Sequence, residues 1–347
     1  MEDYKGKQIY TEDFTAANDY RNTYLDSINS YLDGMITASF EKREQFMKPS
    51  EFAADPEKFR LEYIKMLGKP LTEYKKTLPS YEKNFVASDD MCDIYRMLIE
   101  TMPGFKFYGM LMIPKGLSGK APLVICQHGG GGTPELCSDM HGKNNYSHMT
   151  RRILERNVVV FAPQLMLWNS ANYEIKYNRG ETDARLKAVG SSVTALEIYN
   201  IKKSIDCLEE MDFIDKEKIG MTGLSYGGFF TLYTMAADTR IKSGYSCGCF
   251  SDRTLRCFQD WTWENSYNKF CDAEIAGLCA PRKLYLQIGK TDAVFDYNGS
   301  VKEFDRVPKY YEAFGKAENA CFDLWEGGHT VRDTDDGHNF FFKALLD

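Results

Sequence analysis

Short apolar runs recur along the chain from about residue 85 onward, and longer polar segments separate them. The first two runs meet at Met102-Pro103-Gly104, a turn sequence that predicts an antiparallel hairpin. The later runs read apolar on both faces, as strands do in a parallel sheet that helices cover. These runs span 122–128, 158–163, 218–224, 243–250, 283–289 and 320–326. The pattern predicts an α/β fold with a mostly parallel sheet flanked by helices.

The clearest helix signal lies between the second and third of these runs, over residues 193–211. Its apolar residues recur at three- to five-residue steps and form one stripe, the arrangement of a helix that packs one face on a core. The members of the stripe are Val193, Leu196, Ile201, Ile205 and Leu208.

Residues 1–81 have a different character, because they are rich in Tyr, Glu and Lys and show helical spacing. Pro49, Pro56 and Pro70 predict a break into short helices. We expect a helical extension that packs on the α/β domain at 82–347, since its aromatic side chains need a surface to cover. A cap over the site and a contact between copies in a homo-oligomer remain open as further roles.

Composition narrows the class of protein. The chain has 347 residues and a net charge of −7 without a long Lys/Arg run, which argues against nucleic acid as a partner. The N-terminus lacks the apolar segment of a signal peptide, and no apolar run approaches the roughly 18 residues of a membrane span. Ten scattered cysteines fit reduced core thiols, and Cys247-Gly-Cys249 lacks the spacing of a zinc site. We therefore expect a soluble cytoplasmic protein that binds no metal.

The sequence GLSYGG at 223–228 places Ser225 between Gly223 and Gly227 in a G-x-S-x-G pattern. A strand-like run precedes it and an apolar, helix-like stretch follows it, which is the context of a nucleophile elbow. Glycines are needed there because neighbouring side chains would collide in the sharp turn. The sequence predicts Ser225 as a nucleophile, and a glycine-rich turn with an idle serine is the alternative.

A serine nucleophile needs a base and an acid that orients the base. His329 directly follows the last strand, where this fold places the base, whereas His338 lies in a predicted C-terminal helix. Asp292 follows the preceding strand, and Asp296 is better suited to the N-cap of the next helix or to a solvated loop. We predict the triad Ser225, His329 and Asp292.

Hydrolysis through such a serine also needs donors for the oxyanion. The run His128-Gly129-Gly130-Gly131-Gly132 follows a strand, and its backbone N–H groups meet no side-chain obstruction. We predict donors at Gly130 or Gly131 and at the N–H of Tyr226, the residue after the nucleophile. A merely flexible loop is the alternative for the glycines.

Three cap-like insertions are expected near 133–150, 166–190 and 251–270. Trp168, Trp261 and Trp263 lie in them and are candidates for stacking on a sugar ring, although they could equally fill the core of a cap. Arg179 and Arg185 could bind an acidic group from a lid or belong to a solvated surface.

With these motifs the chain resembles the α/β-hydrolase superfamily, in the branch of acetyl xylan esterases and dienelactone-hydrolase-like proteins. The resemblance covers roughly 82–347 and includes GLSYGG, QHGGGG and the run 272–296, where Ala-Pro-Arg leads into the strand that bears the acid. It implies a serine esterase on one domain with variable insertions. Two features depart from the pattern: the nucleophile is serine where dienelactone hydrolases use cysteine, and Tyr226 stands where acetyl xylan esterases usually have glutamine.

These observations predict a cofactor-free serine esterase that cleaves short-acyl esters, possibly on carbohydrates, through an acyl-enzyme. A peptidase of the prolyl-oligopeptidase type shares the elbow and the order of the triad, but about 81 helical residues cannot form the propeller that such enzymes usually carry. A non-catalytic binding protein on the same fold is the third reading.

Overall fold

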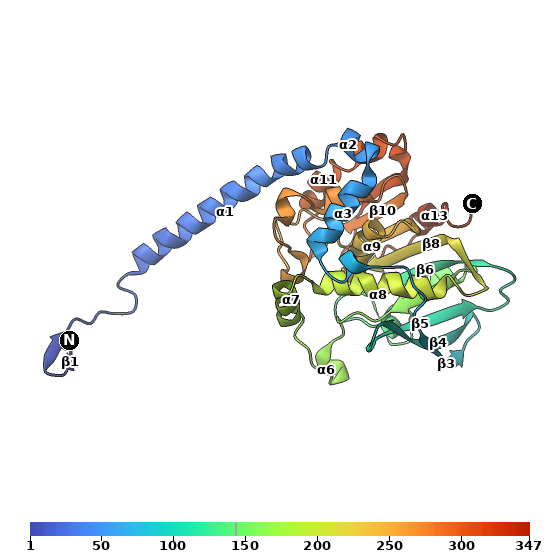
Figure 1. Cartoon of the computed structure of the whole chain (residues 1–347), viewed down its shortest axis with the longest axis horizontal. Coiled ribbons are helices and arrows are strands. Elements are labelled where there is room, and N and C mark those ends of the chain that lie inside the picture. The colour runs from blue at the N-terminus through green and yellow to red at the C-terminus, as the bar shows by residue number, and fades with distance from the viewer. Residues whose placement is uncertain (143) are drawn as a thin grey trace.

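The computed structural model describes residues 1–142 and 144–347, so Lys143 of the predicted insertion at 133–150 lies outside it. A nine-stranded sheet forms the centre of the molecule (Figure 1). From one edge to the other, its strands are β11 (Ala320–Trp325), β10 (Lys283–Gly289), β9 (Ile241–Cys247), β8 (Ile214–Leu224), β6 (Ala121–Gln127), β7 (Val159–Pro163), β5 (Phe105–Pro114), β4 (Cys92–Met102) and β3 (Tyr81–Ser88).

The six runs that predicted parallel strands all form strands, and all six pair in parallel from β7 to β11. The predicted hairpin is the antiparallel pair β4 and β5, and β5 joins the parallel part through an antiparallel pairing with β7. The prediction of a mostly parallel sheet is confirmed. Strand β3 was not predicted, because all eight of its residues are exposed and its sequence shows no buried face.

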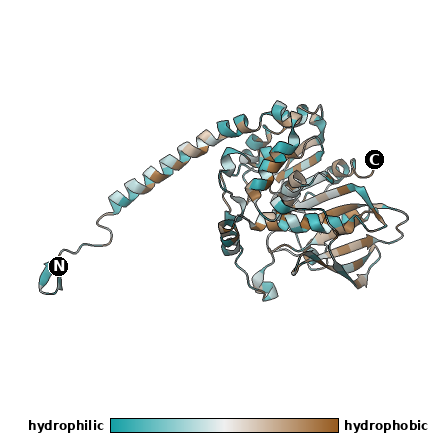
Figure 2. Ribbon diagram, viewed as in Figure 1, coloured by the Kyte–Doolittle hydropathy of each residue, from teal (hydrophilic) through white to brown (hydrophobic). Residues whose placement is uncertain are grey.

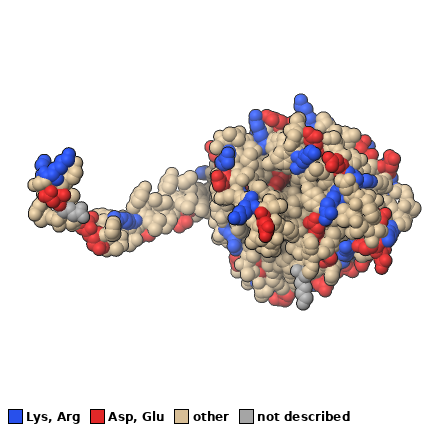
Figure 3. Space-filling view, turned by 90° about the horizontal axis from the view of Figure 1, so that it is seen from below, with Lys and Arg blue, Asp and Glu red and all other residues tan. Residues whose placement is uncertain are grey.

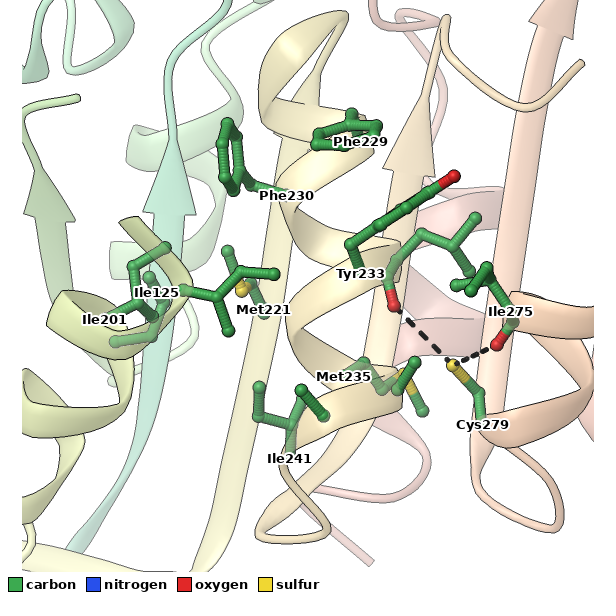
Figure 4. Close-up of a cluster of buried hydrophobic side chains, with 14 of the residues drawn as sticks. Ile125, Ile201, Met221, Phe229, Phe230, Tyr233, Met235, Ile241, Ile275 and Cys279 are labelled. Carbon is green, nitrogen blue, oxygen red and sulfur yellow. Dashed lines mark hydrogen bonds between the residues drawn. The ribbon is translucent and has the colours of Figure 1, made fainter. Parts of the chain in front are cut away.

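Both faces of the sheet are covered, which explains why its central strands read apolar throughout. In β6, Leu123 and Ile125 belong to one buried cluster, whereas Val124 and Cys126 belong to the other. The first cluster is shown in Figure 4, where Ile125 and Met221 of the sheet meet Ile201, Phe230 and Met235 of the helices in front of it. Alternate residues of one strand thus fill two cores.

Helices of the part of the chain after residue 81 lie on both sides of the sheet. The predicted helix over 193–211 is α8 (Val193–Leu208), and it is buried on nearly every side because the N-terminal segment covers the face that would otherwise meet solvent. Of its predicted stripe, only Leu196 is partly exposed. The remaining helices are α4 (Pro134–Cys137), α5 (Met149–Leu154), α6 (Ser170–Tyr173), α7 (Arg179–Ala188), α9 (Tyr226–Ala237), α10 (Asp272–Leu278), α11 (Tyr297–Phe304), α12 (Pro308–Glu312) and α13 (Asp336–Phe342).

The N-terminal segment differs from its prediction. Helices α2 (Pro49–Ala54) and α3 (Pro56–Leu67) begin at prolines as expected, and the short η1 (Leu71–Glu73) follows. Helix α1 (Asn18–Phe46), however, runs for 29 residues, because no proline interrupts the sequence before 49.

Only the end of α1 packs on the part of the chain after residue 81, together with α2 and α3. The rest projects away from it and ends in a small hairpin of β1 (Glu2–Tyr4) and β2 (Lys7–Ile9) (Figure 1). The expectation that the extension covers its aromatic residues by packing is therefore wrong for residues 3–35, whose side chains are almost all exposed.

Most of the cysteines lie in the core, as expected for core thiols. All ten cysteines are free, and eight of them are buried. Among the described residues, no helix is both long enough and apolar enough to cross a membrane.

Candidate active site

Ser225 occupies a sharp turn between β8 and α9, at the carboxyl end of the parallel sheet. Its backbone has φ 61° and ψ −121°, a strained conformation for a residue with a side chain. The turn is held from both sides, because Ser225 N donates to Cys247 O at 2.9 Å and Phe229 N donates to Ser225 O at 2.9 Å. The local sequence therefore forms a nucleophile elbow.

The glycines around Ser225 are needed for space. A Cβ at Gly223 would lie 2.5 Å from the carbonyl group of Gly227, and one at Gly227 would collide with Gln127 O at the end of β6. A Cβ at Gly228 would collide with Cys247 O. Strands β6, β8 and β9 thus approach the start of α9 so closely that no side chain fits at these three positions.

His329 and Asp292 lie together after the last two strands. Asp292 follows β10 and His329 follows β11, and His329 Nδ1 lies 2.7 Å from Asp292 Oδ2. The other carboxylate oxygen accepts backbone N–H groups from Val294 at 2.7 Å and Phe295 at 3.1 Å. Burial opposes ionisation of this carboxyl, but the hydrogen bonds from His329 and the two amides outweigh it and lower the pKa of Asp292.

The imidazole of His329 approaches the elbow from the side of β9. A Cβ at Gly248 would lie 3.3 Å from both Nδ1 and Cε1 of His329, and the preceding residue, Cys247, accepts the hydrogen bond from Ser225 N. The described hydrogen bonds include none between Ser225 Oγ and His329. Such bonds are often long in unliganded enzymes and tighten when substrate binds.

The glycine loop after β6 passes beside the serine. A Cβ at Gly129 would lie 3.2 Å from Cβ of Ser225, and one at Gly130 would lie 3.3 Å from the ring of Tyr226. Gly129 N donates to Tyr146 Oη at 2.8 Å, and Gly132 N donates to Gly129 O. The loop is therefore held in place by its own hydrogen bonds.

The hydrogen bonds of the glycine loop show which of the predicted oxyanion donors are still free to bind an oxyanion. Gly131 N donates to Leu167 O at 2.6 Å, so this amide has a partner already and the prediction of Gly131 as a donor needs correction. Within the described part of the chain, Gly130 N has no hydrogen-bond partner, and Tyr226 is the first residue of α9, where an N–H has none within the helix. Gly130 and Tyr226 remain as the pair of candidate donors.

A buried ionic network holds the side chain of Tyr226. Its hydroxyl donates to Asp260 Oδ1 at 3.1 Å, and Asp260 Oδ2 accepts from Arg179 Nε at 2.6 Å. Arg179 also makes two hydrogen bonds to the carboxylate of Glu197, at 3.0 and 2.8 Å. Both carboxylates bind the guanidinium of Arg179, so it is not free to bind an acidic group of a substrate. Arg179 instead links the insertion at 166–190 to Asp260 in the insertion at 251–270, and through Asp260 to Tyr226 of the elbow. Among the described residues, no such contact is found for Arg185.

The three tryptophans have different positions. Trp261 is only 3% exposed and stacks on Phe229 at 4.6 Å, so it fills the core beneath Tyr226 instead of offering a face to a sugar. Trp263 is also buried and lies over Tyr233. Trp168 is partly exposed and lines a cavity of about 430 Å³ with Phe107. For Trp261 and Trp263 the structure favours the alternative of a filled core.

His128 and His338 are buried and have other structural roles. His128 is buried; its Nδ1 lies 2.9 Å from Gly129 O, and its Nε2 accepts from Leu165 N at 3.1 Å, so it fastens the glycine loop. Burial lowers the pKa of His128 to about 4. His338 is buried in α13 with its ring edge on Tyr245, and burial lowers its pKa to about 3. Asp296, the other acid considered, is the N-cap of α11, as predicted.

Two supporting residues were missed by the sequence reasoning. Tyr146 accepts the Gly129 amide, and Asn145 Nδ2 donates to His329 O at 2.9 Å. Asn145 O also accepts from Thr330 Oγ1 at 2.7 Å. Both lie in the insertion at 133–150, which thereby supports the glycine loop and the loop that carries His329 at once. Their only sequence signal was their place in a polar insertion that follows the glycine run.

Comparison with known proteins identifies solved structures with a similar fold. No family model matches the sequence, and no curated protein does. Among solved structures, a Bacteroides fragilis protein assigned as an acetyl xylan esterase is similar over 87% of this chain and 84% of its own, with 15% identity and a TM-score of 0.66. A glucuronoyl esterase from Solibacter usitatus is similar over 84% and 92%, with 18% identity and a TM-score of 0.64. A methylesterase is similar over 90% and 70%, with 19% identity and a TM-score of 0.64.

The architecture of the sheet and these similarities identify an α/β-hydrolase fold, and the fold predicted from the sequence is confirmed. The structural neighbours include acetyl xylan esterases, in agreement with the suspected branch. At identities below 20%, the similarity extends to the fold and leaves the reaction to be argued from the site.

Proposed function

We propose that this chain is a serine esterase that cleaves short-acyl esters of carbohydrates. The observation that carries the proposal is the 2.7 Å contact between His329 Nδ1 and Asp292 Oδ2, beside a strained serine turn and an unpaired Gly130 amide. A glycine-rich turn with an idle serine would not need a histidine and a buried carboxylate from two other strand ends. The same arrangement disfavours a non-catalytic binding protein.

The reaction proceeds in two steps. Ser225 Oγ attacks the ester carbonyl while His329 Nε2 takes its proton, and Asp292 holds the imidazolium through Nδ1–H. The N–H groups of Gly130 and Tyr226 stabilise the oxyanion, each contributing about 3 kcal/mol to the lowering of the barrier. His329 then gives the proton to the leaving alcohol, which departs and leaves Ser225 acylated. Water, activated by the same imidazole, releases the acid and restores the serine.

The substrate class rests on the names of the structural neighbours, which include acetyl xylan, glucuronoyl and methyl esterases. In an acetylated sugar the carbohydrate is the alcohol, whereas in a glucuronoyl or methyl ester of a sugar acid it lies on the acyl side. We favour the acetylated sugar. Of the three tryptophans considered for stacking on a sugar, Trp168 is the one that is partly exposed, although it lines a cavity beyond the glycine loop.

The test is turnover of p-nitrophenyl acetate, of acetylated xylose and of the methyl ester of glucuronic acid by the full chain. Ser225→Ala should lose at least about 10⁴-fold in kcat, whereas Ser30→Ala, on the exposed part of α1, should keep full activity. Turnover of the acetates that survives in folded Ser225→Ala would reject the proposal. Cleavage of a proline-containing peptide without ester turnover would favour the peptidase reading.

Other parts of the prediction stay predictions. The cytoplasmic location rests on the scattered, free thiols, and independence from metals and cofactors rests on the chemistry of the triad. The domain boundary near residue 81 and the lack of a nucleic-acid partner also remain predictions from the sequence.

A further inference from the structure

The projecting part of α1 carries a wide apolar face that nothing in the described part of the chain covers. Three tyrosines on this face are 71–81% exposed, and the aliphatic side chains between them are about half exposed. Figure 2 shows hydrophobic residues along the projecting helix, and in Figure 3 most of that helix is uncharged. At 100° per residue these side chains share one side of the helix. The face consists of Tyr20, Tyr24, Leu25, Ile28, Tyr31, Leu32, Met35 and Ile36.

This face cannot turn back onto its own molecule. Helix α1 is continuous from 18 to 46, and its end is fixed by the buried Arg43, whose Nη1 lies 2.9 Å from both Glu274 and Glu303. Glu44 adds ion pairs with Arg306 and Lys309, each at 3.3 Å. A straight helix anchored at one end holds its other end away from the body, so another molecule has to cover the apolar face.

We propose that a second copy of this chain covers it, with the two α1 helices antiparallel about a twofold axis near Ile28 and Leu32. The apolar face is continuous with the side by which α1 already packs on its own molecule, because Ser39 and Arg43, further along that side of α1, are buried. The antiparallel arrangement lets the face meet its own equivalent, which is the form of a twofold interface.

A groove lies where the partner helix would arrive. It has a volume of about 580 Å³ and is open between α1 and the loop 262–268. Leu32, Met35 and Ile36 line its helix side, and Trp263 and Tyr267 line the other. In the antiparallel arrangement, the Tyr20 and Tyr24 end of one helix lies beside the residues near 36 of the other, which border this groove.

The charges of α1 favour a protein surface over a membrane. Asp19, Asp26 and Asp33 follow one another at seven-residue steps and lie on the side opposite to the apolar face, where they remain in water in the dimer. Arg21 lies within the angular range of the apolar face near its N-terminal end, and its guanidinium turns back toward the chain end and donates to Phe14 O at 2.9 Å. Helices that bind lipid surfaces usually carry several Lys or Arg on the polar side, and this helix carries acids there.

The size of the face suits a stable dimer. Exposed aromatic side chains bury about 150 Å² or more each, so three tyrosines and the aliphatic residues between them offer on the order of 800 Å² per copy. Two copies then bury about 1,600 Å², the size of a standard specific interface. The dimer would also cover the loop 262–268, which directly follows the residues that hold Tyr226.

Sedimentation equilibrium of the full chain between about 1 and 100 µM tests the proposal. The wild type should have the mass of two chains of 39.8 kDa. Leu25→Asp with Leu32→Asp should shift it to one chain across the range. Thr23→Asp with Ser30→Asp places the same charges on the polar side of the same helix and should leave the dimer intact.

Each alternative has its own result. A wild type that stays monomeric at 100 µM overturns the proposal, and so does a dimer that the Leu25→Asp, Leu32→Asp variant leaves unchanged. A monomer that sediments with vesicles of anionic lipid assigns the face to a membrane instead. Circular dichroism and hydrolysis of p-nitrophenyl acetate, measured on all variants, show that the substitutions leave the catalytic part folded.

Discussion

Replacing Asp292 by Asn tests the site most sharply, because the change keeps the shape of the side chain and alters one hydrogen bond. The side chain of Asp292 is fully buried, and its Oδ1 accepts two backbone amides. An asparagine keeps those bonds only if its oxygen stays there, which turns its NH₂ group toward His329 Nδ1. Nδ1 must then accept, so the imidazole carries its proton on Nε2 and cannot take one from Ser225.

The expected loss follows from this change of tautomer. The same substitution in a serine-protease triad lowers kcat by about 10⁴-fold, so we expect a loss of about 10³- to 10⁴-fold here, which corresponds to about 4–5.5 kcal/mol in the barrier. The assay is hydrolysis of p-nitrophenyl acetate at saturating substrate, with folding checked by circular dichroism.

Asp296→Asn is the matched control. Asp296 caps α11 by accepting from Gly299 N, and asparagine caps helices as well as aspartate does, so this variant should keep its activity. Asp292→Asn that remains within tenfold of the wild type would refute the assignment of the acid. A large loss in Asp296→Asn alone would move the acid to that position.

Three further predictions concern the supporting structure. Gly227→Ala should lower the free energy of unfolding, measured in urea, by more than about 3 kcal/mol, because the added Cβ collides with the end of β6. Gly34→Ala, in open space on α1, should be neutral or stabilising. Equal effects of the two substitutions would be inconsistent with a crowded turn at Gly227. Tyr146→Phe leaves the Gly129 amide unpaired, at a cost of about 1–3 kcal/mol, and loosens the oxyanion loop. It should therefore lower kcat by about 10- to 100-fold with little change in KM. An unchanged kcat would count against Tyr146 as a support of the oxyanion loop. His338 has a folded-state pKa of about 3, below its ordinary 6.5, so below pH 6.5 the unfolded chain takes up a proton that the folded chain does not, and the wild type loses stability. His338→Phe lacks this loss, so its free energy of unfolding relative to that of the wild type should rise by about 2 kcal/mol from pH 7 to pH 5. A difference in the free energy of unfolding that does not depend on pH would refute this.

Much of the catalytic part could be predicted because one physical signal dominates it. Strands buried on both faces need apolar residues at every position, and the runs that became β6 to β11 have them. The signal fails at the edges of the molecule. Strand β3 has no buried face, so its sequence lacks the alternation of apolar and polar residues that marks a strand. The length of α1 follows from the absence of proline and not from a core that the helix covers.

The site shows the same division between local and distant determinants. Ser225, His329 and Asp292 could be proposed from the sequence because the fold places each at the end of a particular strand. The choice of Gly130 over Gly131 depends on a hydrogen bond to Leu167, a partner more than thirty residues away that no local pattern reveals. Trp261 stacks on Phe229 for the same kind of reason, since its burial depends on the packing of an insertion against the elbow helix.

The central claim is that Ser225 is a nucleophile activated by His329, and covalent labelling by a fluorophosphonate probe measures this directly. Intact mass and peptide mapping of the full chain should show one label, on Ser225, and the labelling rate should fall by at least about 100-fold in His329→Gln. A wild-type chain whose Ser225 stays unlabelled, or whose Ser225 is labelled equally fast with and without His329, would contradict the account.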